Sequence, residues 1–301
     1  MNILVSGLLN VETTVAIRGF PIQYYPIDYP FFGVRSAVSG VGFNLAKALK
    51  TLGDRVTLLS FLGQDEEGAR VLRALAREGI PAERVALRLR GTPVSAVLYD
   101  PEGRRQIYCD LKDIQDQTLD PAGLEELLSG CDLAALCNIN FNRELIRAAR
   151  RLGVTTATDV HVLSAVEDAY NRDFMENAEI LFLSDEALPC PPADFLRRLR
   201  DRYQNRILVL GMGAQGAMLL ERDREPVTVP AYTRGSVVNT VGAGDALFSA
   251  FVHCFGKGLS PRAALERAVV FAGIKIGFHG ASEGFCGEPE LEELLRRERS
   301  V

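Results

Sequence analysis

The chain has 301 residues, of which 34 are Lys or Arg and 39 are Asp or Glu, so its formal net charge is −5. This mild acidity argues against a nucleic-acid-binding protein, which usually gathers a basic excess on one face. With 47% hydrophobic and 24% charged residues, the composition is that of an ordinary folded protein, which excludes wholesale disorder.

The cysteines and the apolar runs indicate a reduced, soluble protein. The sequence has no Cys-x-x-Cys pair and no histidine at ligand spacing from a cysteine, so neither a structural zinc site nor a redox motif is expected. The N-terminal segment MNILVSGLLNVETT has no basic leader, and no apolar run approaches the roughly 20 residues of a membrane span. We therefore expect a cytoplasmic protein with no membrane partner and with reduced thiols.

Short apolar runs alternate with helical stretches, which is the pattern of a parallel sheet covered by helices. We predict strands at residues 3–6, 56–61, 133–138, 155–159, 180–183 and 207–210. We predict helices at 43–52, 66–78, 143–152, 194–203 and 246–255, and a last long helix from 261 to about 278. The predicted fold class is therefore α/β, with three α/β/α layers and a mostly parallel central sheet.

Two stretches interrupt this alternation. Residues 13–35 are rich in aromatic residues and prolines, and residues 92–110 read as a hairpin with its turn at Gly103. Because neither could bury a face alone, we expect them to pair into a small β-sheet that acts as a lid or a dimer contact; the alternative is two unrelated surface excursions. The predicted domains are a main domain (1–12, 36–90 and 111–301) and a small β lid (13–35 and 91–110).

The most informative motif is the turn Asn239-Thr-Val-Gly-Ala-Gly-Asp245, which an apolar helix follows at once. Glycines before a helix free the main-chain amides to converge, and together with the helix dipole they form a site for a phosphate or an oxyanion. Asp245 at its mouth could accept a proton from an attacking hydroxyl. The alternative is an aspartate that only complements the helix dipole.

Two further glycine turns accompany it. Gly211-Met-Gly-Ala-Gln-Gly216 follows a strand and formally matches a dinucleotide-binding fingerprint, but AMLL and PVTVPAY after it indicate a hairpin instead of a helix, so we reject that reading. The turn could still lie against a nucleotide. Ser39-Gly-Val-Gly-Phe-Asn44 opens a helix, where glycines allow close approach to the backbone and Asn44 suits a polyol; a plain capped helix start is the alternative. No P-loop motif occurs.

In this order, the turns resemble the ribokinase-like sugar kinase family of the PfkB type. The family carries Gly-Gly-x-x-x-Asn early and Asp-Thr-x-Gly-Ala-Gly-Asp late, and this chain has SGVGFN at 39–44 and NTVGAGD at 239–245. The resemblance spans nearly the whole chain and implies a ribokinase-like fold. It also implies ATP-dependent phosphorylation of a hydroxymethyl group on a ribose- or fructose-like sugar, with Mg²⁺ and, in many relatives, a monovalent cation such as K⁺. A homodimer formed through the lid is expected as well.

The resemblance also implies residue roles. Asp245 would be the base, and Gly242, Ala243 and Gly244 the anion hole. The substrate would meet Gly40, Gly42 and Asn44. The nucleotide side would comprise Gly211, Gly213, Gly216, Thr240, Gly242, Gly244, His279, Gly280 and Ala281.

Four departures from the family pattern alter these expectations. Glu12 stands in the first substrate turn in place of Asp, which shifts its carboxylate by about 1.5 Å. Asn239 replaces the Asp that helps hold a monovalent cation, which puts K⁺ in doubt. Gly211 replaces a Thr near ATP. The segment that orders Mg²⁺ through water reads LFLSDEALP, so Asp185 or Glu186 would have to supply the charge.

Other polar residues stay open as candidates. Asp159 and His161 lie at the C-terminal end of a predicted strand, at the edge where ligands bind in such sheets, although a structural role is preferred for His161. His253 is expected beside the core. Arg104 or Arg105, in the hairpin, could close over the phosphate or be solvated loop charges. The aromatic residues of 13–35 could pack in a dimer or stack a base, so a nucleoside kinase is an alternative function, as is a catalytically weak sugar- or nucleotide-binding protein.

Overall fold

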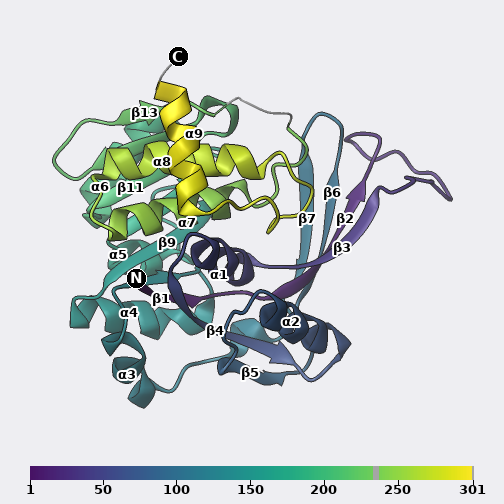
Figure 1. Ribbon diagram of the computed structural model, residues 1–301, viewed down its shortest axis with the longest axis horizontal. Coiled ribbons are helices and arrows are strands. Elements are labelled where there is room, and N and C mark those ends of the chain that lie inside the picture. Colours follow the sequence, from purple (N-terminus) through teal and green to yellow (C-terminus); the bar gives the residue numbers. More distant parts are fainter. Residues whose placement is uncertain (233–236, 300–301) are drawn as a thin grey trace.

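The computed structural model describes residues 1–232 and 237–299, which form two sheets (Figure 1). The larger sheet has the strand order β13-β12-β11-β10-β9-β8-β1-β4-β5. All its neighbouring pairs from β5 to β11 are parallel, and β12 and β13 add antiparallel pairs at one edge. Its strands are β1 (Asn2–Ser6), β4 (Arg55–Gly63), β5 (Arg84–Leu89), β8 (Leu133–Leu136), β9 (Thr155–Val162), β10 (Ile180–Ser184), β11 (Ile207–Gly211), β12 (Ala217–Glu221) and β13 (Val227–Val229).

Helices cover both faces of this sheet. One face carries α1 (Val41–Thr51), α2 (Glu66–Arg77), α7 (Ala243–Gly256) and α8 (Pro261–Lys275), with α9 (Glu288–Arg299) packed on α8; the other carries α3 (Leu124–Ser129), α4 (Arg143–Leu152), α5 (Arg172–Asn177) and α6 (Pro192–Tyr203). Along β1, Ile3 and Val5 join the first core, and Leu4 joins the second. This alternation follows from the period of two in a strand that is buried on both faces. The predicted α/β/α fold is confirmed.

The C-terminal part of the chain differs from the prediction. Helix α8 ends at Lys275, before the expected end near 278, and α9 follows it, so the prediction that the last long helix ends near 278 was wrong. Among the side chains of α9 that the structure describes, only Leu291 and Leu295, one turn apart, are buried, and most of the others are charged. Such a narrow apolar stripe gives a weak periodic signal, and packing against α8 stabilises the helix.

The smaller sheet has the order β3-β2-β6-β7 and projects from the side of the main domain (Figure 1). Its strands are β2 (Asn10–Ala16), β3 (Val34–Ser39), β6 (Val94–Tyr99) and β7 (Arg105–Asp110). Strands β6 and β7 form the predicted hairpin, and β2 pairs in parallel with β6, which joins the two interrupting stretches. The predicted pairing is thus confirmed, and β2 and β3 extend it to Asn10 and Ser39.

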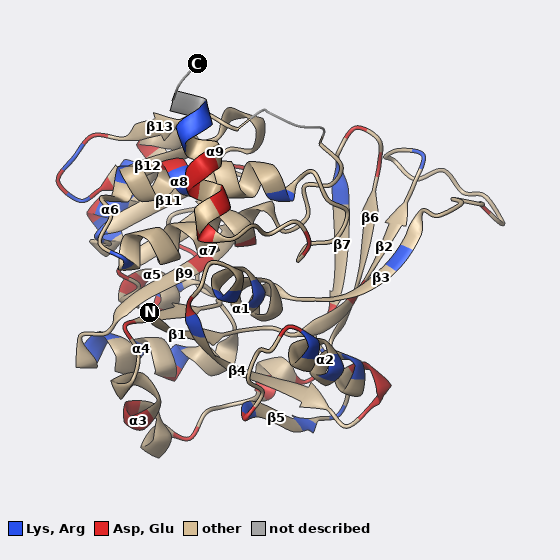
Figure 2. Ribbon diagram, in the orientation of Figure 1, with Lys and Arg blue, Asp and Glu red and all other residues tan. Residues whose placement is uncertain are grey.

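The connection between two strands of the smaller sheet carries a group of exposed aromatic side chains. In the segment between β2 and β3, these are Tyr24, Tyr25, Tyr29, Phe31 and Phe32. Figure 2 shows acidic and basic residues interspersed over the main domain in that view. No helix in the described part of the chain is long and apolar enough to cross a membrane.

The order in which the chain adds strands to the main sheet predicts where a ligand binds. From β1, the chain first adds β4 and β5 on one side, and later β8 to β11 on the other. In sheets of this kind, ligands bind at the carboxyl ends of the strands where the direction of winding reverses. That place is the carboxyl end of β1 and β8, where Ser6 and Leu136 pair.

Candidate active site

The turn before α7 is pressed against the segment that follows α8. Gly242 has a φ of 80°, and a Cβ on it would lie 2.3 Å from the carbonyl oxygen of Ala281, so only glycine fits there. Helix α7 begins at Ala243, three residues earlier than predicted, and Gly244 and Asp245 therefore lie in its first turn. The amide of Ala243 donates to the Thr240 carbonyl at 3.1 Å. The amides of Gly242, just before the helix, and of Gly244, in its first turn, are among those that a helix start leaves without an intrahelical acceptor.

Asp245 is half-buried and receives a hydrogen bond from a distant part of the chain. The side-chain amide of Asn44, in α1, donates to its Oδ2 at 2.7 Å across 201 residues of sequence. Burial raises the pKa of Asp245 to about 6; Asp159 adds to the rise, whereas Asn44, His161 and Lys275 oppose it. Asp245 and Asp159 line one small cavity with Cys137, at the carboxyl end of β8, which is the predicted edge of the sheet.

The glycines before Asn44 are explained by chain packing. Gly40 has a φ of 99°, and a Cβ there would lie 2.5 Å from the Leu8 carbonyl oxygen. The amide of Gly42 donates to the same carbonyl at 2.9 Å. Both glycines thus let α1 start directly against residues 7–9, which join β1 to β2. Their expected contact with a ligand stays a prediction.

Glu12 lies within strand β2, so the expectation of a turn at this residue was wrong. Its side chain is half-buried, and its pKa is raised by burial and by Asp245, while Lys275 and Ser39 oppose the rise. The connection between β1 and β2 is short, because β2 starts at Asn10, only four residues after β1 ends, and the strand therefore already includes Glu12. The carboxylate therefore stands on a rigid strand of the smaller sheet and lies in the field of Asp245.

Two buried amide oxygens near these residues have no hydrogen-bond donor among the described residues. They are Oδ1 of Asn10 and Oδ1 of Asn44. The other end of each side chain is bonded: Asn10 donates to the Ser95 hydroxyl at 2.9 Å, and Asn44 donates to Asp245. Buried carbonyl oxygens without a donor are rare, because losing water is costly. The sequence analysis missed Asn10, whose only signal was its position two residues before Glu12.

Lys275 is a second residue that the sequence analysis missed. Its side chain is fully buried at the end of α8, and its ammonium donates to the carbonyls of Asn239, at 3.2 Å, and Val241. Burial lowers its pKa to about 8, whereas Asp245 and Glu12 oppose that shift. A lone lysine within the apolar run VVFAGIKIGF was the available signal.

The loops after β10 and β11 lie side by side. Ser184 pairs with Gly211, and the amide of Asp185 donates to the Gly211 carbonyl at 3.1 Å. Burial and the neighbouring Glu186 raise the pKa of Asp185. Arg105, on β7 of the smaller sheet, reaches this loop, with its guanidinium 3.1 Å from Glu186 and 3.2 Å from the Thr240 hydroxyl.

The turn between Gly211 and Gly216 leads into an antiparallel strand. Gly216 has a φ of 93°, and a Cβ there would lie 2.1 Å from the Val229 carbonyl oxygen of the neighbouring strand. Gly213 also has a positive φ, but a Cβ on it would meet no atom within 4 Å. Because β12 and β13 follow where a dinucleotide-binding fold has a helix, the rejection of that fingerprint is confirmed.

The segment after α8 completes the surroundings of the turn before α7. The side-chain amide of Asn239 donates to the His279 carbonyl at 2.7 Å. The amide of Gly280 donates to the Glu283 carboxylate at 3.1 Å, and Ala281 is buried beneath Gly242. The His279 side chain itself is exposed. The structure therefore brings together residues 239–245 and 279–281, as the candidate site requires.

The remaining candidates separate into near and remote residues. His161 lies at the end of β9, with its Nδ1 3.7 Å from Asp159, close enough to influence Asp245. Arg104 pairs with Asp100 at 2.8 Å within the smaller sheet, away from the turn before α7. His253 is buried at the far end of α7, where its Nδ1 lies 2.7 Å from Asp54, in agreement with its predicted place beside the core.

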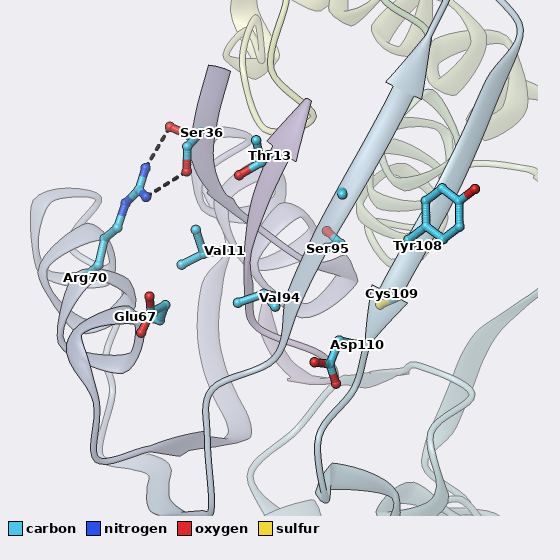
Figure 3. A pocket seen from close by; sticks show the side chains of 11 residues that line it. Val11, Thr13, Ser36, Glu67, Arg70, Val94, Ser95, Tyr108, Cys109 and Asp110 are labelled. Carbon is cyan, nitrogen blue, oxygen red and sulfur yellow. Dashed lines mark hydrogen bonds between the residues drawn. The ribbon is translucent and has the colours of Figure 1, made fainter. Parts of the chain in front are cut away.

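A larger hollow, of about 620 Å³, lies on the other side of the smaller sheet (Figure 3). Val11 and Thr13 line it, and because they flank Glu12 along β2, the Glu12 side chain faces away from it. Arg70 of α2 closes one side through two hydrogen bonds to Ser36, at 2.8 and 2.7 Å. None of Asn44, Asp159 and Asp245 lines this hollow, so the candidate active site is the smaller one.

Comparison with known proteins agrees with this arrangement. The pfkB family carbohydrate kinase model matches residues 30–286. Acarbose 7(IV)-phosphotransferase from an Actinoplanes species is 27% identical over 86% of this chain and 87% of its own length. Deoxyribokinase from Salmonella typhi is 26% identical over 98% of this chain and 99% of its own.

Solved structures show the same fold. A microbiome-derived acarbose kinase superposes with a TM-score of 0.85 at 23% identity, covering 98% of this chain and 99% of that one. A nucleoside kinase from Burkholderia thailandensis in complex with inosine gives 0.83 at 17% identity, covering 100% and 99%. With its family model matched over most of its length and its glycine turns gathered at one edge of the sheet, this chain belongs to the pfkB family of carbohydrate kinases.

Proposed function

We propose that the protein transfers the γ-phosphoryl group of ATP to a hydroxymethyl group of a ribose- or fructose-like sugar, with Asp245 as the general base. One observation carries this proposal. Asp245 stands in the first turn of α7, beside the turn at Gly242, and Asn44 from the other glycine turn holds its carboxylate at 2.7 Å. A base and an anion site are thus adjacent, as an in-line phosphoryl transfer requires.

The electrostatics of Asp245 suit a base. With a pKa of about 6, its carboxylate is ionised at neutral pH yet close to the range in which a base accepts a proton efficiently. Asn44 fixes its orientation. The amides of Gly242 and Gly244, at the positive end of the α7 dipole, would face the charge that develops on the transferred group.

The acceptor is proposed to be a polyol. The buried amide oxygens of Asn10 and Asn44 both lack a hydrogen-bond donor from the residues that the structure describes, and the hydroxyl groups of a sugar can donate hydrogen bonds to them. Glu12, with a raised pKa, adds a further acceptor nearby. Among the relatives, one is named for acarbose, one for deoxyribose, and one nucleoside kinase holds inosine; all three of these molecules contain a sugar or a sugar-like ring.

The nucleotide is proposed to lie along the turns at Gly211, Gly213 and Gly216, between Thr240 and residues 279–281. Mg²⁺ keeps several waters and takes only one or two carboxylates besides phosphate oxygens. Asp185 and Glu186, on the loop joined to Gly211, fit that donor set. Bound there, Mg²⁺ would supply positive charge to the β- and γ-phosphates.

The smaller sheet is proposed to act as a lid over the site and, through its outer surface, as a homodimer contact. Arg105 on β7 contacts Thr240 and Glu186 of the main domain, and Glu12 on β2 lies in the field of Asp245. A lid excludes water from a phosphoryl transfer, which otherwise loses ATP to hydrolysis.

The test is a panel of acceptors with ATP and Mg²⁺, in which ADP release is measured for pentoses, hexoses, acarbose and nucleosides. A sugar that is phosphorylated, with turnover abolished in D245N, supports the proposal. Turnover of nucleosides alone would favour the nucleoside kinase, with the aromatic residues of the lid as the place to stack a base. Ligand-induced thermal stabilisation without turnover of any acceptor would indicate a binding protein instead.

A further inference from the structure

The ammonium group of Lys275 has an uncommon environment. Lysine is almost never fully buried unless it is paired, because the charge loses its water. Lys275 is fully buried, and both acceptors of its hydrogen bonds are main-chain carbonyls, those of Asn239 and Val241. A positive charge held by carbonyl oxygens is the arrangement by which proteins bind a monovalent cation.

The two carbonyls belong to the turn that precedes α7. Main-chain hydrogen bonds tie this turn to the end of α8, since the amides of Val238 and Asn239 both donate to the Ile276 carbonyl, at 2.8 and 3.0 Å. The side chain of Asn239 extends this link to His279. Lys275 therefore lies where the two segments that surround the anion site meet.

The residues present do not fit a bound K⁺ ion. Its carbonyl ligands would be those of the turn, and Lys275 already donates to two of them. The side chain of Asn239 is also hydrogen-bonded at both ends: its Oδ1 accepts from the Val241 amide at 2.9 Å, and its Nδ2 donates to the His279 carbonyl. An aspartate could not make the second bond, because it has no hydrogen to donate.

We propose that Lys275 is a built-in monovalent cation, whose ammonium takes the place of K⁺ beneath the turn at 239–242 and makes the protein independent of K⁺. Asn239 and Lys275 then form one unit. The lysine supplies the positive charge that, in relatives with an aspartate at this position, a bound cation would supply. The neutral side-chain amide of Asn239 joins the turn to the segment after α8. The same charge lies in the field of Glu12 and Asp245 and favours their ionised forms.

The first experiment uses the wild-type protein. Its melting temperature without ligand and its rate of sugar phosphorylation are measured in KCl, NaCl and tetramethylammonium chloride at equal ionic strength. We expect no selective effect of K⁺ on either, with rates within about twofold, because a cation that does not bind the folded state cannot stabilise it. A melting temperature that rises selectively with K⁺, or a rate several times higher in K⁺ than in NaCl, would overturn the proposal.

The second experiment uses K275A, which removes the ammonium and leaves the two carbonyls without their donor. We expect its melting temperature to fall, and to recover in K⁺, ammonium or methylammonium but not in tetramethylammonium, which is too large for the space. K275M, which fills the space with an apolar chain, should not respond. K257A is the matched control, because Lys257 is an exposed lysine at the other end of α7, paired with Glu288.

A folded K275A that ignores every cation would contradict the proposal. If K275A does not fold, the wild-type salt series decides alone. The kinetic readout rests on the proposed function, whereas the melting temperatures do not, so absence of any kinase activity would refute that function and leave this inference to the thermal data.

Discussion

The two ends of helix α7 carry similar chemistry in different surroundings. At its start, Asp245 is bonded by Asn44; near its end, His253 is bonded by Asp54, and both bonds are 2.7 Å long. Both ends also hold a buried polar atom without a hydrogen-bond partner in the part of the chain that the structure describes, Oδ1 of Asn44 and Nε2 of His253. The difference is access, because Asp245 is half-buried and lines a cavity. The side chains of His253 and Asp54 are 2% and 1% exposed.

The difference separates a reactive group from a structural one. A sealed pair of polar groups holds elements together and cannot meet a substrate. A half-buried carboxylate that lines a cavity and has a raised pKa is typical of a functional site. We therefore expect changes at the start of α7 to alter turnover, and changes near its end to alter stability.

The largest effect is expected for D245N. Loss of the base should lower kcat by about 10²- to 10⁴-fold, measured by coupled ADP release. The raised pKa means that the ionised carboxylate costs stability; this cost develops as the pH rises from about 4, where an Asp in the unfolded chain ionises, to about 6, and is constant above that. The melting temperature of D245N at neutral pH should therefore equal or exceed that of the wild type. A loss of turnover below about tenfold would show that Asp245 is not the base.

The next effect concerns Asn44. Wild-type kcat/KM should rise with pH through about 6 and then level off, because the base acts ionised. N44A removes a hydrogen bond that lowers the pKa of Asp245, so this rise should move to higher pH. A hydrogen bond to a charged group contributes about 1.5–3 kcal/mol, so kcat/KM should fall about 10- to 100-fold. An unchanged pH profile would mean that Asn44 does not orient Asp245.

A smaller effect is expected on the lid side of the same helix end. Arg105 contacts Glu186 and Thr240, and as a partly exposed ion pair this contact contributes up to about 1 kcal/mol. R105A should raise the KM for ATP about three- to fivefold. R104A is the matched control and should leave that KM unchanged, since Arg104 pairs with Asp100 and Glu102 inside the smaller sheet. Equal effects of the two variants would remove Arg105 from the nucleotide side.

The smallest effect on turnover is expected at the far end of α7. H253A leaves the buried Asp54 carboxylate without one partner, at a cost of about 1–3 kcal/mol. Its melting temperature should fall by several degrees, at about 2–4 °C per kcal/mol, while kcat stays within about twofold of the wild type. Calorimetry and steady-state kinetics on one preparation test this directly. A large loss of kcat in H253A without a lower melting temperature would contradict the structural role that we assign to the far end of α7.

Much of the fold could be predicted from short-range patterns. Apolar runs such as 207–210 identify strands that are buried on both faces, because each residue needs an apolar neighbour above or below the sheet. The turn at Gly103 and the alternation around it are typical of a hairpin, and the strand after Gly216 excludes a dinucleotide-binding helix. These features depend on residues a few positions apart, so local sequence contains them.

Only the tertiary structure decided which distant residues meet. Asn44 and Asp245 are 201 residues apart, and no periodicity predicts their bond. Lys275 became informative only when its burial and its two carbonyl acceptors were known, and Arg104 and Arg105 differ only in what each reaches. The physical reason is that a local pattern records which face of an element is buried, whereas the pairing of buried polar groups depends on how whole elements pack against one another.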